Sequence, residues 1–598
     1  MSKTLRKEQS PIATFFKLWK FMLSQKTWVL TALLISVVLY SLLGPLTIYL
    51  GGYIVDAVVR FYESASWVTL LGVKIAYPLF FVLLLGLVLL IQELLLALIM
   101  YLYRTLDIFL NSGKAEQYII EKFYSFNLAD LESLDIYTNI EVFTRFWASN
   151  AYWAIRNTFR IIGGLVSLAF ILIIFAKEAD TLVIGPLILV IIGVIGSGII
   201  SGYSKRVLYK VNVSMSNLRR WLVYIRQTTL SITTFMEQKV NGIYRLFLGE
   251  LERAGQKFVQ IKTTLLNYKT LSELISLLVR LYGYIGGRVL YAYTAILNRV
   301  SVGTIVANFG LLGNFYTTSN QLFTYTSDLL ENLLYVGSFF HILELNSPYF
   351  SVHGRVEVPA KQPILIEWRN LTYKLSKSNK VLLKDTNWVI EPFQKVFVYG
   401  QDGVGKTFLA KILTTLFPVP RGTYFINGVD VVDIKRGNVK ALFSVVTDNF
   451  GTYSLPLYEN ITLQEDPDQI DKEKYELALY IAQLDQWARQ NRLMWSNKPL
   501  GATFGDMPLS RGYWQRIAIA RAVYRDAPIF LFDMPFTYVD DHGKTTIMER
   551  VLRYVSSEKK TLIYITEEFD FWKYFDAWYQ KTPTQIKPIK RMGLFAKA

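Results

Sequence analysis

Six long apolar runs in the first half of the chain constrain the fold more than any other feature. The first four are long and apolar enough to cross a bilayer. The last two carry Tyr, Arg, Asn and Thr, so we expect spans that face a bundle interior or a water-filled cavity rather than lipid. One such run could be a buried core helix, but six of them predict an all-α, six-helix membrane domain. The runs lie near 28–50, 68–101, 160–176, 181–202, 273–297 and 302–325.

Composition and charge exclude several classes of protein. The chain has 598 residues, 52% of them hydrophobic, and a formal net charge of +17. The positive residues gather beside the spans, as with Arg104 and Lys205, which fits membrane topology and anionic lipid better than nucleic acid. There is no cysteine, which excludes disulfides and thiol chemistry, and the three histidines are too scattered for a metal centre.

The order of segments predicts a membrane domain followed by an α/β domain. Two long polar stretches with helical periodicity interrupt the membrane half, and we expect them to be helices that extend into the cytoplasm. From about residue 363, β-rich runs alternate with helical ones, as in an α/β nucleotide-binding domain. The expected parts are an interfacial segment at 1–26, a membrane domain at 27–345 with cytoplasmic loops at 103–155 and 203–272, a linker at 346–362, and the α/β domain at 363–598.

A glycine-rich loop in the second half predicts a phosphate site. The sequence 396–413, VFVYGQDGVGKTFLAKIL, contains the pattern G-x-x-x-x-G-K-T between an apolar run and a helix-like run. In that context the glycines let backbone N–H groups face phosphate oxygens, and the helix N-terminus favours an anion. Lys406 would supply a charge for the outer phosphates, and Thr407 a hydroxyl for Mg²⁺. The expected ATP-binding residues here are Gly400, Gln401, Asp402, Gly403, Val404, Gly405, Lys406, Thr407 and Phe408.

With these segments in order, the chain resembles a half-transporter of the ATP-binding-cassette (ABC) exporter family along essentially its whole length. The phosphate loop, the strand "APIFLFDMP" at 527–535 and the segment "LSRGYWQRIAIARAV" at 509–523 carry the resemblance. Weaker echoes are "VSVGTIVANFGLL" at 300–312 and "DLESLDIYTNI" at 130–140, which is loosely similar to peptide and bacteriocin exporters. The resemblance implies ATP and Mg²⁺ as cofactors and a cassette on the cytoplasmic side of the cell membrane.

Several positions depart from the family pattern at the chemistry itself. Asp533 ends an apolar strand and would hold Mg²⁺ with Thr407, and Asp448 stands where the family has a glutamine. Met534 replaces the acidic residue that acts on the attacking water, and a thioether cannot accept a proton. Glu567 replaces the family's histidine, and a carboxylate there would repel a γ-phosphate. We therefore expect ATP binding with no intact catalytic pair.

The nucleotide contacts outside the phosphate loop are altered too. Tyr373 lies two residues from the position expected for the adenine-stacking aromatic. In the signature segment Ser510 and Gly512 remain available for a γ-phosphate, while Arg511 and Tyr513 replace the family's residues. Because such cassettes work in pairs, and each site uses the signature of the other chain, the resemblance favours a heterodimer with a catalytically intact second half-transporter.

Charged residues within the spans suggest a substrate path. Arg280, Tyr284 and Arg288 recur at i, i+4 and i+8 and share one helix face, while Glu93 lies inside the second apolar run. A structural pair between Glu93 and an arginine is one interpretation, and a path for an anionic or peptide cargo is the other.

Two functions from different classes fit these observations. The first is a subunit of an ATP-driven exporter for an amphipathic solute, with a peptide as one candidate. The second is a membrane-bound ATP sensor or scaffold without transport. A soluble P-loop kinase attached to a membrane anchor fits poorly, because the signature-like segment would then have no role.

Overall fold

The computed structural model describes residues 10–589, with gaps at 65–66, 71–72, 127, 132–133, 178–180, 346–353, 360–361, 376–379 and 502–507. The chain forms two compact units, a helical unit and an α/β unit, which are described separately. The helical unit comprises Met1–Lys122 and Thr138–Glu344, and the α/β unit comprises Phe123–Tyr137 and Leu345–Ala598. The linker predicted at 346–362 falls largely outside the described residues.

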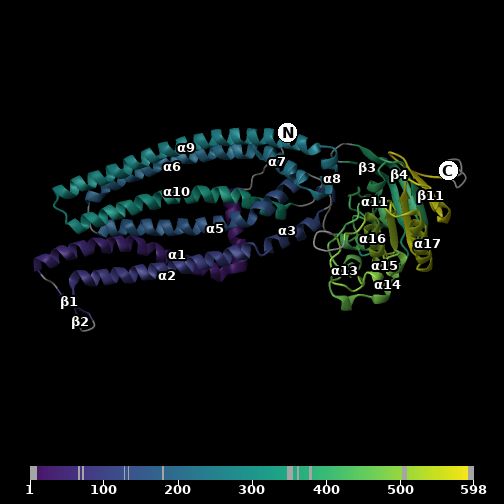
Figure 1. The fold of residues 1–598 in the computed structure, drawn as a ribbon, viewed down its shortest axis with the longest axis horizontal. Coiled ribbons are helices and arrows are strands. Elements are labelled where there is room, and N and C mark those ends of the chain that lie inside the picture. The colour runs from purple at the N-terminus through teal and green to yellow at the C-terminus, as the bar shows by residue number, and fades with distance from the viewer. Residues whose placement is uncertain are drawn as a thin grey trace. The chain divides into compact units, whose positions relative to one another are not determined.

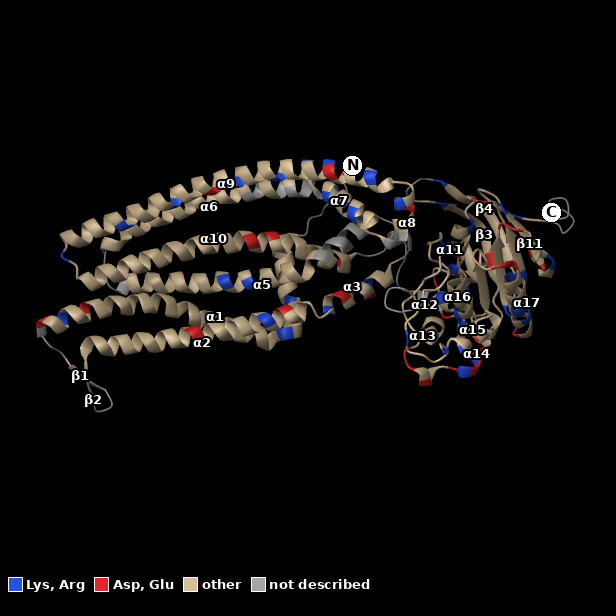
Figure 2. Cartoon of the chain, viewed as in Figure 1, with Lys and Arg blue, Asp and Glu red and all other residues tan. Residues whose placement is uncertain are grey.

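Long helices make up the helical unit (Figure 1). Figure 2 shows that charged residues are sparse along α1, α2 and α10. The helices are α1 Pro11–Ser64, α2 Tyr77–Leu110, α3 Lys114–Ser125, α5 Leu134–Lys177, α6 Ile184–Ser214, α7 Ser216–Thr229, α8 Ile232–Val240, α9 Ile243–Leu297 and α10 Val302–Glu344, with a 3-10 turn at Thr181–Val183. Helices α3 and α5 each cross from one unit into the other.

Four helical segments of the described chain are long and apolar enough to cross a membrane. They are Pro11–Glu63, Tyr77–Ser125, Phe146–Ala176 and Ile184–Ser204. Helices α9 and α10 are equally long but more polar, as the sequence predicted, so the count of six spans stays a prediction.

The fifth apolar run does not only face inward. Helix α9 packs along α6 through small residues, because a Cβ on Gly283 would lie 2.7 Å from the Leu189 carbonyl oxygen and one on Gly287 would lie 2.9 Å from the Pro186 oxygen. On its other side α9 exposes Tyr282, Val289 and Ile296. Within this chain that apolar stripe is uncovered, so the expectation that the span faces a bundle interior or a cavity stays a prediction.

The ends of the first two apolar runs differ from the sequence prediction. The run expected at 68–101 begins with an antiparallel hairpin, β1 Trp67–Leu70 and β2 Val73–Ala76, and α2 starts only at Tyr77. Pro78 occupies the first turn of α2, where its missing N–H has no intrahelical partner to lose. Helix α1 is broken at Lys26, whose φ of −141° and ψ of 45° are not helical. Before this break, Leu18 and Met22 are buried against the other helices.

A mostly parallel six-stranded sheet forms the centre of the α/β unit. Its order is β12-β11-β5-β10-β9-β8, and only β12 runs antiparallel to its neighbour. Apolar side chains fill both faces, and every residue of β9 and β10 is buried, as expected for a sheet covered on both sides. The strands are β5 Lys395–Tyr399, β8 Phe443–Val446, β9 Ile529–Asp533, β10 Thr561–Thr566, β11 Ala577–Lys581 and β12 Ile586–Pro588.

Helices and a smaller antiparallel sheet complete this unit (Figure 1). The smaller sheet has the order β4-β3-β6-β7. A short helix from the first half of the chain, α4 Leu128–Leu131, belongs to the same unit, and Leu128 packs against its core. The remaining elements are β3 Ile366–Lys374, β4 Val381–Ile390, β6 Tyr424–Ile426, β7 Val429–Asp430, α11 Lys406–Leu413, α12 Arg436–Ala441, α13 Leu457–Thr462, α14 Lys472–Ile481, α15 Asp485–Gln490, α16 Arg511–Arg525 and α17 Asp541–Ser557, with 3-10 turns at Pro467–Gln469 and Trp572–Tyr574.

Candidate nucleotide site

The glycine-rich loop joins the central strand β5 to helix α11, as the sequence pattern predicted. Gly403 and Gly405 have φ values of +75° and +94°, a region in which a side chain would be strained. Gly405 also caps α11 without any side-chain hydrogen bond, so the helix N-terminus remains available to an anion. This geometry fits a cradle for the phosphates of a nucleotide.

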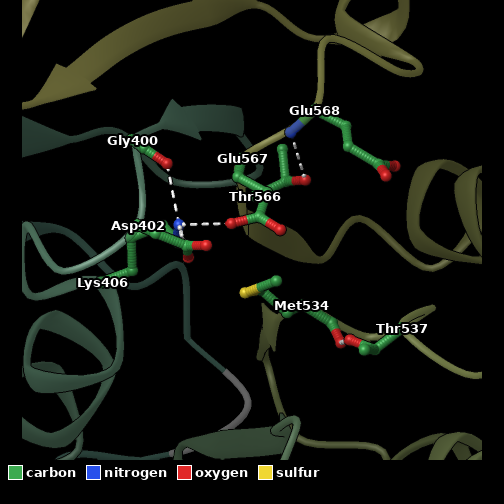
Figure 3. A network of polar contacts seen from close by, with 8 residues as sticks. All are labelled: Gly400, Asp402, Lys406, Met534, Thr537, Thr566, Glu567 and Glu568. Carbon is green, nitrogen blue, oxygen red and sulfur yellow. Dashed lines mark hydrogen bonds and ion pairs between the residues drawn. The ribbon is translucent and has the colours of Figure 1, made fainter.

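Lys406 is the charged centre of this loop, and its contacts are drawn in Figure 3. Its side chain is buried, and its Nζ donates to the Gly400 carbonyl oxygen at 2.8 Å. The same Nζ lies 3.1 Å from Glu567 Oε2 and 3.5 Å from Asp402 Oδ1. The cation expected to bind the outer phosphates therefore contacts two carboxylates of its own chain.

Glu567 directly follows the buried strand β10, at the carboxyl edge of the sheet where the loop also lies. Its side chain is 34% exposed, whereas that of Lys406 is 6% exposed. A hydrogen bond with Glu567 and the charge of Lys406 lower the pKa of the exposed Asp402 carboxyl. The sequence suggested that Glu567 would repel a γ-phosphate, and the structure adds a direct contact with the phosphate-loop lysine.

A buried carboxylate beside this loop fits a magnesium ion. Both oxygens of Asp533 are buried and have no hydrogen-bond partner within the described part of the chain. Burial and, to a smaller extent, the neighbouring Asp448 carboxylate together raise the pKa of Asp533 to about 7. Unsatisfied buried carboxylate oxygens suit a hard cation. Thr407, Asp533 and Asp448 are the residues that would hold Mg²⁺, which would supply charge neutralisation for the bound phosphates.

Met534 occupies the position after Asp533 with a strained backbone. Its φ is +50°, which is uncommon for a residue with a side chain. Its N–H donates to the Ile565 carbonyl at 3.0 Å, and its own carbonyl accepts from Gln515 at 3.3 Å and from Thr537 at 3.1 Å. In Figure 3 it lies across from Lys406 and Glu567. The backbone is thus held firmly at a position where the side chain cannot act as a base.

The signature segment begins helix α16. Ser510 is its N-cap and is exposed, without a side-chain cap bond. A Cβ on Gly512 would lie 2.7 Å from the Tyr538 carbonyl oxygen, so only glycine allows this close approach. Arg511 bonds the Tyr538 hydroxyl with its guanidinium over that ring, and Tyr513 stacks on Trp487. Ser510 therefore stays accessible, while the two substituted side chains are held by neighbours in the same unit.

A buried lysine under the phosphate loop was missed by the sequence analysis. Lys581 is 2% exposed, and its Nζ donates to the carbonyl oxygens of Thr582 at 2.7 Å, Leu382 at 3.0 Å and Val404 at 3.2 Å. Burial lowers the pKa of Lys581 to about 8. It joins strands β4 and β11 to the loop, and no local pattern in the sequence indicates this, because the partners are up to 199 positions away.

The expected adenine platform is not at the surface. Tyr373 is buried in the core of the smaller sheet, and its ring packs edge-on against Phe417. A stacking platform needs a free ring face, so we no longer assign Tyr373 to adenine. In the loop itself, Gln401 and Asp402 are exposed, while Val404, Thr407 and Phe408 are half-buried.

The residues suggested for a substrate path do not form one cluster. Glu93 is exposed and has no ion pair with any described residue. Arg288 donates to the Phe309 carbonyl at 3.0 Å and lies over the ring of Tyr284. The Nε of Arg280 is buried without a hydrogen-bond partner among the residues that the structure describes. The proposed pair between Glu93 and an arginine is absent within that part, and a cargo role for these residues stays a prediction.

Comparison with known proteins identifies the class. Residues 383–537 match the family described as ABC transporter, and this range includes the phosphate loop, the signature segment and Asp533. The fold resembles a solved bacterial Atm1-family ABC exporter with ATP bound, at a TM-score of 0.78 and 17% identity, over 95% of this chain and 96% of that one. The chain is thus a multi-pass integral membrane protein in which a helical membrane domain is fused to a cytoplasmic ABC cassette.

Curated relatives extend the similarity into the membrane half. The chain is 24% identical over 446 residues to the subtilin transport ATP-binding protein SpaT of Bacillus subtilis, covering 72% of this chain and 69% of the relative. It is 24% identical over 489 residues to the nisin transport ATP-binding protein NisT of Lactococcus lactis subsp. lactis, covering 77% and 78%. An ATP-dependent lipid A-core flippase of Aromatoleum aromaticum is 27% identical over 275 residues, 46% of this chain. The chain is homologous to ABC exporters, with bacteriocin transport proteins among its relatives.

Proposed function

We propose that this chain is the catalytically degenerate half of a heterodimeric, ATP-driven exporter that moves an amphipathic solute across the cell membrane, with a peptide as the leading candidate. The fold that this chain shares with a solved ABC exporter supports ATP-driven export. Two relatives named for the transport of subtilin and nisin support a peptide-like cargo.

The observation that carries the proposal is the contact between Lys406 and Glu567. In this chain the lysine that would bind the outer phosphates is held 3.1 Å from a carboxylate. Met534 stands beside Asp533 without a proton acceptor. ATP would have to displace Glu567, and Met534 cannot activate a water molecule beside the bound phosphates, so this site would hold nucleotide rather than turn it over.

Two exposed surfaces support the proposal that a second chain binds this one. Ser510 is exposed at the start of α16, ready to serve a phosphate loop from elsewhere. The tip formed by α8 and the start of α9 exposes Met236, Val240 and Tyr244, at 79%, 75% and 39%. By contrast, Leu128 of the first cytoplasmic loop already packs inside the α/β unit of its own chain. Among the described residues of the two loops, the second tip exposes apolar side chains that a partner cassette would cover.

The same features support one alternative, a membrane-bound ATP sensor that does not transport. The missing base and the occupied lysine fit nucleotide binding without turnover. A sensor would function alone, whereas the exporter half requires an intact partner.

Isolation of the chain from its native membrane after cross-linking tests the proposal. We expect one co-purifying ABC half-transporter whose sequence keeps the acidic residue after its strand-end Asp. In the reconstituted pair, substitution of the partner's phosphate-loop lysine should abolish ATP hydrolysis, while Lys406→Ala in this chain should leave much of it. A chain that purifies alone or as a homodimer, and still drives ATP-dependent transport in proteoliposomes, would contradict the heterodimer.

A further inference from the structure

A polar cavity lies inside the helical unit, apart from the residues that the sequence suggested for a substrate path. It has a volume of about 360 Å³ and is lined by residues of α1, α2, α5 and α10. Two of these residues are Arg156 and Arg160 of α5, and none of the lining residues is Asp or Glu. The volume suits a small organic group, and the lining carries two positive charges and no negative one.

The two arginines keep most of their hydrogen-bond donors unused. Arg156 donates to the Tyr152 hydroxyl at 3.3 Å, and its Nε is buried without a partner. Arg160 makes no hydrogen bond or ion pair with any described residue. Each guanidinium offers five donors and binds a carboxylate or phosphate through two of them at once. The cavity therefore contains unsatisfied donors in a geometry that an oxyanion would satisfy.

Aromatic rings hold the guanidinium groups in place. Arg156 lies 5.0 Å from the ring centre of Trp153 and 5.4 Å from that of Tyr103, and Arg160 lies 5.0 Å from that of Tyr325. These contacts lower the cost of two unpaired cations in a membrane protein. A contact with an aromatic ring uses no N–H donor, so the donors that bind carboxylates and phosphates remain available.

The face of α5 that carries the arginines is fixed by close helix packing. Arg156 and Arg160 are followed on the same face by Gly163 and Gly164, which also line the cavity. A Cβ on Gly163 would lie 2.5 Å from Ser41 Oγ of α1, and one on Gly164 would lie 2.8 Å from Leu322 of α10. A side chain at either glycine would collide with Ser41 or Leu322, so the glycines allow α5 to pack closely on α1 and α10 beside the arginines.

The contacts of the arginine pair argue against a purely structural role. Like charges at i and i+4 repel on a helix. Two acids, Asp328 and Glu331, line a neighbouring pocket with Trp153, but neither arginine forms an ion pair with a described residue. Ionisable residues of a membrane domain without protein partners are commonly functional.

We propose that this cavity is a binding site for the anionic group, carboxylate or phosphate, of an amphipathic molecule, with Arg156 and Arg160 as its ligands. The inference names the substrate class of the export function proposed above and rests on it. Binding is measured without ATP, so a lack of anion binding contradicts only this site. Anion binding without ATP-dependent transport contradicts only the proposed function.

The test uses the full chain in nanodiscs of zwitterionic phosphatidylcholine. Binding of a fluorescent twelve-carbon carboxylate is followed by anisotropy, with empty nanodiscs subtracted. Dodecyl phosphate should displace this probe, dodecanol should do so at least about 10-fold less well, and dodecyltrimethylammonium should not displace it. Dodecanol that competes as well as dodecyl phosphate would overturn the proposal, because the cavity would then recognise only the chain.

Substitutions test whether Arg156 and Arg160 are the residues that bind the probe. Arg156→Gln with Arg160→Gln should weaken probe binding by roughly 10-fold or more, whereas Arg156→Lys with Arg160→Lys should keep part of it because the charge remains. Arg104→Gln is the matched control, since Arg104 is an exposed arginine on α2 outside the cavity. A Gln pair that retains ATP binding and binds the probe as tightly as the unaltered chain would contradict the site.

The lipid composition of the nanodiscs shows whether the bound anion is a lipid headgroup or a dissolved amphiphile. If nanodiscs with phosphatidylglycerol lose probe binding, an anionic lipid headgroup is the occupant. If they keep it, the occupant is a dissolved amphiphile. Both outcomes support the arginine site, while equal probe binding by the Gln pair in both membranes contradicts it. Should the Gln pair fail to fold, competition between the headgroups on the unaltered chain still decides the question.

Discussion

At the scale of single residues, the Glu567 carboxylate competes with the phosphates of ATP for one lysine. Lys406 is buried and makes a 3.1 Å contact with Glu567, which is about one-third exposed. Because solvent reaches the Glu567 carboxylate and screens its charge, the pair contributes on the order of 1 kcal/mol. This is too little to exclude ATP, which also binds the backbone of the loop and a metal ion. Glu567 should therefore weaken ATP binding without abolishing it.

The change Glu567→Gln tests this competition. It removes the negative charge and keeps the shape, so ATP affinity should rise by about 5-fold, the equivalent of about 1 kcal/mol. Equilibrium binding of a fluorescent ATP analogue to the purified chain measures it. Glu568→Gln is the matched control, because Glu568 pairs with Lys544 rather than Lys406, and its affinity should stay unchanged. An unchanged or weaker affinity in Glu567→Gln would show that this carboxylate does not compete with phosphate.

Lys581 gives a second prediction at this scale. Lys581→Met keeps the length of the side chain but leaves the carbonyl oxygens of Leu382, Val404 and Thr582 without their donor. Each unsatisfied buried group costs about 1–3 kcal/mol, so the cassette should melt several degrees lower. Amide hydrogen exchange of residues 400–407 should also become faster. Unchanged exchange in this loop, with or without a change in melting, would show that Lys581 does not support it.

At the scale of elements, the tip between α8 and α9 stands out. Between the two helices Gly242 has a left-handed backbone, with φ +67°. Val240 and Tyr244 are exposed beside it, and Ile243 is half-buried. Exposed apolar side chains at the start of the long helix α9 and on the short helix α8 suit a docking contact that passes motion from cassette to membrane domain.

The change Ile243→Asp tests that docking contact. A charge buried at an interface without a partner is strongly unfavourable, so transport by the assembled exporter should fail. ATP binding should persist, because Lys406 lies in the other unit. Ile12→Asp is the control, since Ile12 is 67% exposed on α1, and it should transport normally. Normal transport by Ile243→Asp in proteoliposomes would show that the tip does not transmit the signal.

Local patterns predicted the elements best. The strand–loop–helix arrangement around Lys406 was predicted correctly because its glycines, lysine and threonine lie close together in sequence and its geometry is set by backbone φ values. The β1–β2 hairpin was missed because Val73, Ile75 and Ala76 extend the apolar run that follows, and only Gly72 and Pro78 mark a break. Apolar length alone cannot separate a hairpin from the first turns of a span.

Contacts between distant segments could not be predicted from the sequence. Lys406 and Glu567 are 161 positions apart, and only the adjacency of β5 and β10 brings them together. Arg156 and Arg160 were missed because they lie where a polar stretch passes into an apolar run. Their spacing with Gly163 and Gly164 on one face of α5 is the signal that was available.

At the scale of the whole molecule, the proposed function makes this chain one of the two halves of an exporter. Its cassette has a well-formed phosphate loop, an accessible Ser510 and a candidate metal site around Asp533. It lacks a base at Met534, and its lysine is shared with Glu567. Two copies of this chain would form two poor sites. The account therefore predicts a chain that retains ATP and depends on a different chain for turnover.

The central claim is that this chain alone binds ATP and hydrolyses it very slowly. The most direct measurement follows bound ATP and released phosphate from the same sample of the purified chain in nanodiscs with Mg²⁺, with Lys406→Ala as the control. We expect saturable binding that the control loses, and phosphate release on the order of 100-fold or more below that of an assembly with an intact partner, because a missing base or donor has an effect of this size. Brisk phosphate release by the chain alone that disappears in Lys406→Ala would contradict the account.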